Sequence, residues 1–469
     1  MVLLELAIPL VLAALPSQQR EVEPDDEAGL ALAHAEEQAR DGHYEEARRE
    51  YERIAKHFKG TDAGTTAARR SKPSAFLGSR DLIRTGPSSN RVDVVFLGEG
   101  YQLGEQDQFN DLADEAVSLF EKQPTLREYL PYFNFIRVNL VSAENGVDGF
   151  GRDYDTALGA RTLSTEVGHV GIDPAAVNAM LSELSAHDGY AIVFAKLGVA
   201  GTATGRFATL GGQSMPALIH EWGHAFGALG DEYATHTHER GAAMRGINVA
   251  TSDDPASAPW SHWISARVPG IGVYEGAAGQ VRDAWRPTAS GCVMESGEFF
   301  CRVCQEAMVL AMYSLVDPIE ECRPPAPESG AGLMLGENEL VLEVRVMRPK
   351  SHALQVQWWV QPSASVTSTP PTGPGSRAAG LRIRGETRQP SGPLPPIEGK
   401  PWDETNADND GVHRLRLRAG QLEPGLYRVT CRVRDTTQWA GERYPWVLRD
   451  PQGLLESERA WWLMVMAPR

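Results

Sequence analysis

The sequence has little that suits a nucleic-acid-binding or membrane-spanning protein. Its 469 residues include 45 basic and 62 acidic side chains, a formal net charge of −17, and no long basic run offsets this balance. Such a surface repels polyanions, so we expect no nucleic-acid partner. After residue 16, no segment approaches the ~20 apolar residues that a membrane-spanning helix needs. Cysteine is scarce too: there are five, and four of them lie between residues 292 and 322.

The first sixteen residues form an apolar run that is followed by the polar residues 17–20. The run has the length of the apolar part of a signal peptide and is short for a membrane span. It lacks Lys and Arg and contains Glu5, a departure that an incorrectly chosen start codon would explain. We expect residues 1–18 to be a signal peptide and the protein to be exported, either to the periplasm or out of the cell.

The length of the chain exceeds one ordinary hydrophobic core, so we expect several domains. Residues 26–70 are predicted to be helical, with Asp41-Gly42 as a turn between two helices. An amphipathic stripe supports the second helix: Tyr44, Ala47, Tyr51, Ile54 and Phe58. The turn region resembles the middle of a tetratricopeptide repeat, but a single repeat cannot bury a core, so a helical hairpin is the preferred interpretation.

Residues 71–90 are polar and are predicted to be a linker, and residues 91–322 are predicted to form an α/β domain. Its short apolar runs favour buried strands: 92–97, 133–141 and 190–194. Amphipathic segments between them favour helices, and strands that alternate with helices indicate an α/β layer. Residues 206–210 are a possible fourth strand, expected at the sheet edge above a substrate cleft.

Residues 323–469 change to period-two alternation of apolar and polar side chains, which predicts an antiparallel β-sandwich. A Pro-, Gly- and Ser-rich insertion, residues 362–396, interrupts it. The segment 422–427, which leads into a strand, looks like the corner of an immunoglobulin-like domain. The fold class expected for the whole chain is therefore multidomain: helical hairpin, α/β domain and all-β sandwich.

The most informative stretch is His220-Glu221-x-x-His224. Histidines four apart on a helix lie on one face, one turn apart, and two such imidazoles can bind one Zn²⁺ at about 2.0–2.1 Å. Glu221 lies beside the first ligand, where its carboxylate can take a proton from a metal-bound water. This is the His-Glu-x-x-His pattern of zinc peptidases. Ser214 is the expected N-cap of this helix, and Pro216 fits its first turn.

The residues after the helix supply a third ligand. Gly227 can adopt a positive φ and end the helix, and Asp231 can then turn its carboxylate back toward the histidines. Three protein ligands with one open position are typical of catalytic zinc, whereas structural zinc has four. Two helix histidines that merely contact neighbours would be the non-catalytic interpretation.

Several separated blocks follow one another in a consistent order: 93–101, 142–148, 220–233, 286–288, 292–294 and 300–304. In this order they resemble the IgA-peptidase family of metzincin-like zinc peptidases, over about half the chain, from Val92 to Glu320. The resemblance implies a metzincin-like fold and a zinc-dependent endopeptidase that hydrolyses protein or peptide substrates through a metal-bound water. The N-terminal helices and the β-rich C-terminus lie outside it, and no residue points to antibody as the substrate.

The resemblance also implies roles for particular residues. One catalytic Zn²⁺ would be bound by His220, His224 and Asp231, with Glu221 as general base, and Met294 would supply the methionine-containing turn beneath the metal.

Most metzincins place a third histidine ten positions after the first ligand, and this chain has Gly230 there. Glu232, His236 and His238 therefore compete with Asp231 for the third position.

The cysteines allow two interpretations. Cys301-x-x-Cys304 suits a second metal or redox chemistry, and a structural zinc would also need Cys292 and Cys322. In an exported protein a disulfide is favoured, and Cys292 with one of the Cys301–Cys304 pair is the expected bridge. Cys431 occupies an inward strand position and is expected to be a buried free thiol.

Two other functions fit the same residues. A zinc amidase that acts on cell-wall peptides would use the same metal chemistry on a different amide. A binding or adhesion protein with a vestigial zinc site would use its outer modules for attachment, although the intact His220, Glu221 and His224 argue against it.

Overall fold

The computed structural model divides into two compact units, residues 1–72 and 73–469. It describes residues 24–149, 151–163, 169–197, 200–212, 214–235, 246–326, 332–336, 338–363, 393–408, 411–439 and 441–467. The expected signal peptide, most of the expected insertion, and His236 and His238 lie outside these ranges. Within them, no helix has both the length and the apolar character needed to span a bilayer.

The first unit contains three helices among its described residues, α1 (Pro24–Arg40), α2 (Tyr44–His57) and α3 (Asp62–Arg70). The predicted stripe of α2 is buried, apart from the half-buried Phe58. The sequence analysis expected a two-helix hairpin. A separate third helix forms because the Thr61 side chain accepts a hydrogen bond from the Gly64 amide and starts a new helix.

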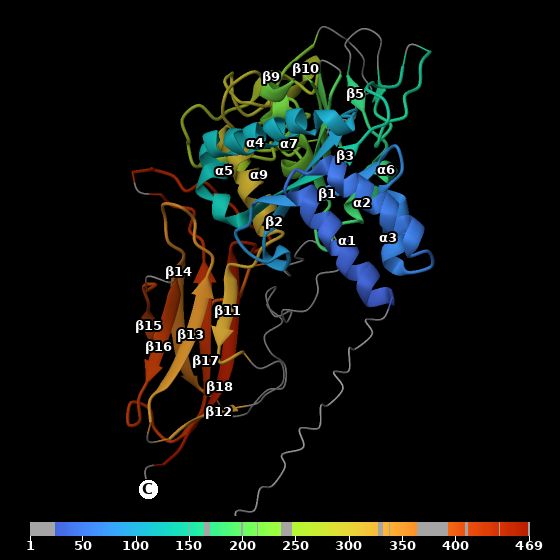
Figure 1. Cartoon of the computed structure of the whole chain (residues 1–469). Helices are drawn as coiled ribbons and strands as arrows, with labels where there is room; N and C mark the ends of the chain where they lie inside the picture. The colour runs from blue at the N-terminus through green and yellow to red at the C-terminus, as the bar shows by residue number, and fades with distance from the viewer. Residues whose placement is uncertain are drawn as a thin grey trace, which may run out of the picture. The chain divides into compact units, whose positions relative to one another are not determined.

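The second unit is built on a six-stranded sheet (Figure 1). Its strands are β1 (Ala75–Ile83), β2 (Val92–Glu99), β3 (Phe133–Val141), β6 (Tyr190–Ala195), β7 (Gly201–Thr204) and β8 (Phe207–Gly211), in the order β1-β3-β2-β6-β8-β7. The four central strands are parallel, and the edge strands β1 and β7 are antiparallel to their neighbours.

Two strand assignments from the sequence need correction. The predicted linker, residues 71–90, contains β1, whose polar residues hid it because an edge strand is only partly buried. The segment 206–210 is not the edge strand. It forms the buried strand β8, and the edge position belongs to β7, which is only half-buried.

Alternating side chains of the sheet enter two different cores. Val94 and Phe96 of β2 face α4 (Gln106–Lys122), α7 (Leu218–Gly227) and α9 (Arg302–Tyr313), whereas Val95 and Leu97 face α6 (Pro174–Leu181). This two-sided burial explains the nearly continuous apolar runs of the central strands. The smaller elements of this part are α5 (Pro124–Glu128), α8 (Ser261–Ser265), β4 (Arg161–Thr162), β5 (Val170–Gly171), β9 (Tyr274–Ala277) and β10 (Gln280–Arg286).

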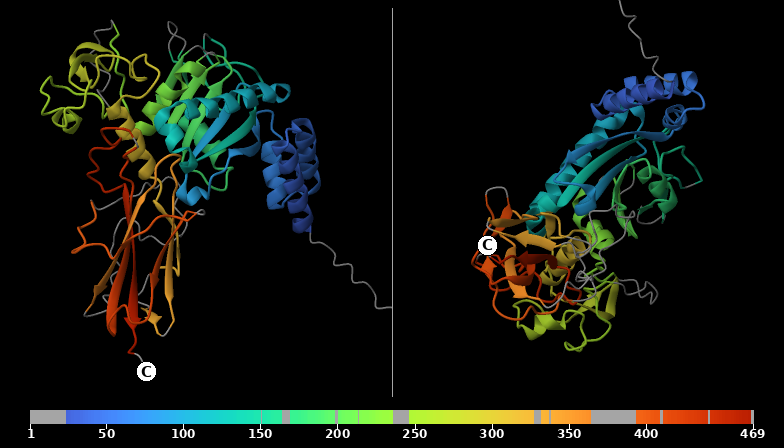
Figure 2. Two further views of the ribbon diagram at one scale, coloured as in Figure 1. Left: turned by 90° about the vertical axis from the view of Figure 1, so that its left-hand side faces the viewer. Right: turned by 90° about the horizontal axis from the view of Figure 1, so that it is seen from below.

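The C-terminal part forms two further sheets, drawn in orange and red in Figure 2. One has the order β11-β13-β16 and the other β12-β18-β17-β14-β15. Their bounds are β11 (Ile319–Arg323), β12 (Gly332–Leu335), β13 (Leu340–Val346), β14 (Gln355–Pro362), β15 (Asp403–Glu404), β16 (Val412–Leu417), β17 (Gly425–Arg434) and β18 (Glu456–Val465). The pairing is antiparallel except between β12 and β18, which are parallel.

Inward side chains of both C-terminal sheets share one core, which continues into the core beneath α7 and α9. Cys431 lies in it as a fully buried free thiol, as predicted. At the start of β17 the Tyr427 hydroxyl donates to the Glu423 carbonyl at 3.0 Å, which fixes the corner that the sequence indicated at 422–427.

A buried ionic cluster connects the C-terminal sheets to the α/β part. His352 bridges two carboxylates, with 2.8 Å between Nδ1 and Glu128 Oε1 and 2.9 Å between Nε2 and Asp435 Oδ1. The hydroxyls of Tyr129 and Tyr313 both donate to Asp435 Oδ2 at 2.7 Å. Burial alone would lower the pKa of His352, but the two carboxylates outweigh it and raise that pKa.

We expect Asp435→Asn to lower the free energy of unfolding by about 3 kcal/mol, because it leaves a buried imidazolium with only one of its two carboxylate partners. The raised pKa of His352 stabilises the fold fully below its unfolded value of about 6.5, and this contribution is lost as the pH rises through the folded pKa. The difference from wild type should therefore shrink above about pH 6.5 in urea denaturation followed by tryptophan fluorescence.

The control is Glu442→Gln, which removes the partly exposed ion pair with Arg302 and should cost less than about 1 kcal/mol. Equal losses for the two variants at every pH would contradict the role of the cluster.

Candidate metal centre

Helix α7 carries His220 and His224 on one face, and its two ends differ from the sequence prediction. A 3₁₀ turn, Met215–Ala217, precedes the helix and contains Pro216, and the Ser214 side chain makes no capping hydrogen bond. At the other end the left-handed residue is Ala228 (φ 51°), not Gly227. Gly227 is needed for space instead, since a Cβ there would lie 2.6 Å from Met308 Sδ.

The Nε2 atoms of both imidazoles point toward the same position. Their Nε2 atoms are 3.0 Å apart, and Asp231 Oδ1 lies 3.1 Å from Nε2 of His220 and 3.2 Å from Nε2 of His224. The other ring nitrogens face backbone carbonyls, with 3.0 Å from His220 Nδ1 to Val293 O and 2.7 Å from His224 Nδ1 to Leu229 O. A proton on each Nδ1 leaves each Nε2 lone pair free to bind a metal.

These three residues, the His–His–Asp group, have the donor set and spacing of a metal site. Ligands about 2.05 Å from a tetrahedral Zn²⁺ are about 3.3 Å apart, close to the observed separations. Asp231 Oδ1 is buried and has no hydrogen-bond donor in the described part of the chain. Two lone pairs and a carboxylate oxygen that face one another repel unless a cation lies between them, so the residues fit a divalent metal.

The electrostatics of the group follow from burial and from the pairing of opposite charges. Burial raises the pKa of Asp231, but the two imidazoles outweigh it and hold that pKa well below its usual range. Burial lowers the pKa of each histidine, and the carboxylate reverses the shift upward. The histidine side chains remain 16% and 21% exposed, so solvent reaches the group.

Glu221 lies one residue after the first histidine and is 7% exposed. No group in the described part of the chain hydrogen-bonds to its carboxylate, and burial raises its pKa. Its side chain lies against the edge strand β7, where a Cβ on Gly201 would be 2.7 Å from Glu221 Oε1. The carboxylate thus lies directly against the edge of the sheet.

Met294 lies beneath α7 in a fully buried position. A Cβ on Gly223 would be 2.6 Å from its Sδ, so the methionine contacts the helix between the two histidines. The preceding residue, Val293, accepts the hydrogen bond from His220, and the Met294 carbonyl accepts one from the Glu232 amide at 2.7 Å. One turn therefore supports both the first histidine and the segment that carries Asp231.

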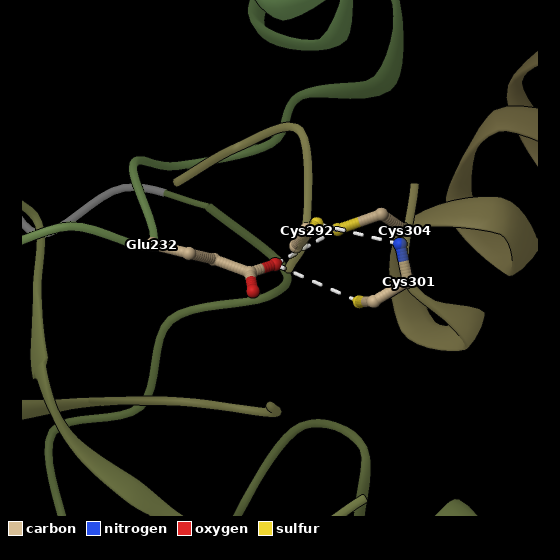
Figure 3. Close-up of side chains that lie close together, drawn as sticks. All are labelled: Glu232, Cys292, Cys301 and Cys304. Carbon is tan, nitrogen blue, oxygen red and sulfur yellow. Dashed lines mark hydrogen bonds between the residues drawn. The ribbon is translucent and has the colours of Figure 1, made fainter. Parts of the chain in front are cut away.

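Glu232, the one competitor for the third position within the described residues, is not in the group. The side chain of Glu232 faces three cysteines instead, as Figure 3 shows. Its Oε1 is 3.0 Å from Cys304 Sγ and 3.7 Å from Cys301 Sγ, and Cys292 Sγ is 3.8 Å from Cys304 Sγ. Burial raises the pKa of Glu232 to about 8.

The expected disulfide is not formed, because all five cysteines are free. Cys322, the fourth candidate, lies on β11 and is not in this cluster. The expected bridge rested on an expected oxidising compartment and not on the distances between the sulfur atoms.

Sequence reasoning missed the residues that orient the ligands. The carbonyls of Val293 and Leu229 could not be found because any residue offers a carbonyl. Asn248 holds both the amide and the carbonyl of Gly230, at 2.6 and 2.9 Å, and so fixes the turn before Asp231. The sequence signal for these contacts lies in two glycines, Gly201 and Gly223. A glycine within a strand or helix can mark a place where another side chain approaches the backbone closely.

We expect Gly223→Ala to lower the free energy of unfolding by about 1–3 kcal/mol, because the new methyl group enters the space of the buried Met294. Thermal unfolding measures the change. Gly104→Ala is the control, since a Cβ there meets nothing within 4 Å, and it should leave stability unchanged or raise it by up to about 1 kcal/mol. A Gly223→Ala variant as stable as wild type would show that Met294 does not support α7.

Comparison with known protein families gives a match to part of the chain. Residues 81–270 match the model of the family described as IgA Peptidase M64. A search of curated proteins found no match to the chain. The matched residues include all of the His–His–Asp group and Glu221, and they end before Met294 and the three cysteines. The part of the chain that carries these residues, 81–270, therefore matches a family of metallopeptidases, IgA Peptidase M64.

Proposed function

We propose that the protein is a zinc-dependent endopeptidase in which His220, His224 and Asp231 bind the metal and Glu221 is the general base. The observation that carries the proposal is the convergence of two Nε2 atoms and one carboxylate oxygen within 3.2 Å of one another. Borderline-soft Zn²⁺ prefers this mixture of imidazole and carboxylate, whereas Ca²⁺ and Mg²⁺ prefer oxygen ligands alone.

When bound, the metal would act as a Lewis acid on the peptide carbonyl and make a water molecule acidic enough to ionise near neutral pH. Glu221 would accept that proton and deliver it to the leaving amine. Burial suits the residue for this role, because a raised pKa strengthens the carboxylate as a base. Asp231 adds a negative charge that a third histidine would lack, and so moderates the Lewis acidity.

The proposal extends to substrate placement. Strand β7 ends the sheet order, and its residue Gly201 lies directly against Glu221. The start of this edge is already covered, since His169 bridges Ala200 and its Nδ1 lies 3.1 Å from the Gly201 carbonyl oxygen, so an extended peptide would add to β7 beyond Gly201. This assigns to β7 the role that the sequence analysis gave to residues 206–210. Met294 is assigned the role of the methionine turn of metzincins.

We expect Glu221→Gln to lower peptidase activity on casein by about 10²- to 10⁴-fold without loss of bound zinc, because the amide cannot accept a proton. Casein hydrolysis and metal content are the two measurements. Glu115→Gln, an exposed residue of α4, is the matched control and should keep full activity.

A comparison of wild type with Glu221→Gln also distinguishes the peptidase from the two other functions. Glu221-dependent release of fragments from peptidoglycan, with casein untouched, would favour a cell-wall amidase. Adhesion without any Glu221-dependent cleavage would favour a binding protein, and either result would overturn the peptidase proposal.

We also expect Gly201→Ala to lower kcat by at least about tenfold with zinc retained, because its methyl group would displace the Glu221 carboxylate. Thr204→Ser on the same strand is the control and should retain kcat, since Thr204 is exposed and its side chain points to the opposite face of β7 from that of Gly201. Steady-state kinetics on a fluorogenic peptide, with metal analysis, tests this. Unchanged kcat in Gly201→Ala would place the working base elsewhere.

A further inference from the structure

We infer that Glu232, Cys292, Cys301 and Cys304, here named the cysteine group, form a second metal site that takes a structural Zn²⁺. Their four ligand atoms lie within 4.8 Å of one another. Figure 3 shows the carboxylate of Glu232 on one side and the three sulfur atoms on the other, all facing a common centre.

The separations fit tetrahedral coordination. With Zn–S of about 2.3 Å and Zn–O of about 2.1 Å, two sulfurs would be about 3.8 Å apart and a sulfur and an oxygen about 3.6 Å apart. The measured values are 3.8 Å between the sulfurs of Cys292 and Cys304 and 3.7 Å between Cys301 Sγ and Glu232 Oε1. Cys304 Sγ is closer, at 3.0 Å from the same oxygen. Four protein ligands leave no open position, which is typical of structural zinc.

Hydrogen bonds from the surroundings orient two of the four ligands, Glu232 and Cys292. Glu232 also accepts hydrogen bonds from Asn248 Nδ2 at 2.9 Å and from Thr288 Oγ1 at 3.2 Å. The Cys301 amide donates to Cys292 Sγ at 3.3 Å. Such hydrogen bonds to ligand atoms orient metal ligands and spread their charge. In the described part of the chain Glu232 forms no ion pair with Lys or Arg, so a metal is the missing positive partner.

A disulfide explains the arrangement less well. It would use two sulfurs at about 2.05 Å, and it would leave the third thiol and a buried carboxylate facing each other with no positive charge between them. Glu232 is fully buried, and Cys292 and Cys304 are buried beside it. A zinc ion satisfies all four groups at once.

The second metal would join three separate segments. Glu232 follows Asp231 directly, Cys292 precedes the turn that contains Val293 and Met294, and Cys301 and Cys304 start α9. The site would therefore hold the segment of the third ligand against the turn that supports His220. This consequence rests on the proposed function, whereas the metal site itself does not.

Metal content tests the inference. We expect about two zinc ions per chain in the wild type, and about one in each of His220→Ala/His224→Ala and Cys301→Ser/Cys304→Ser, measured by mass spectrometry of the purified full chain. Cys322→Ser is the matched control because its thiol is outside the group, and it should keep about two. A wild type with about one zinc and a His220→Ala/His224→Ala variant with none would overturn the second site but leave the proposed peptidase centre intact.

Cobalt substitution tests the ligands without altering any cysteine. Co²⁺ bound to His220→Ala/His224→Ala should give an intense thiolate-to-metal charge-transfer band in the near ultraviolet, and Glu232→Gln added to this variant should weaken cobalt binding by at least about tenfold. Absence of the band would overturn the inference, as would intact-mass evidence for a disulfide among Cys292, Cys301 and Cys304.

Discussion

The orientation of two histidine rings is the constraint on which the rest of this molecule depends. A helix places His220 and His224 on one face, but only the hydrogen bonds from Nδ1 to Val293 O and Leu229 O direct both Nε2 atoms to one point. Both carbonyls belong to segments outside the helix, so the metal centre requires the correct packing of the turn 292–294 and of the chain just after α7. Met294, Gly223 and Asn248 supply that packing.

Much of this arrangement could be predicted from the sequence. Period and motif predicted the central strands β2, β3 and β6, the helices α2 and α4, and the His-Glu-x-x-His face, because each depends on side chains close together in the sequence. The resemblance to the peptidase family correctly predicted the match to the IgA Peptidase M64 model. The C-terminal alternation predicted β-sheets, although the parallel pairing of β12 with β18 has no sequence signal.

The failures share a physical reason, which is that they depend on contacts between distant residues. Strand β1 is polar enough to resemble a linker, and only its pairing with β3 defines it. The contacts of Glu232 could not be predicted from its position beside Asp231, because they are made with cysteines more than fifty residues away. The disulfide was predicted from an expected oxidising compartment rather than from the distances between sulfur atoms, and the prediction is wrong because the cysteines are free thiols.

The ionic cluster around His352 bears on how this chain can be divided. Strand β11 pairs with β13, and Asp435 of the C-terminal part accepts hydrogen bonds from Tyr129 and Tyr313 of the α/β part. A cut near residue 323 would strip a strand from its sheet and leave buried charges facing solvent. The α/β part and the β-rich part therefore form one cooperative folding unit.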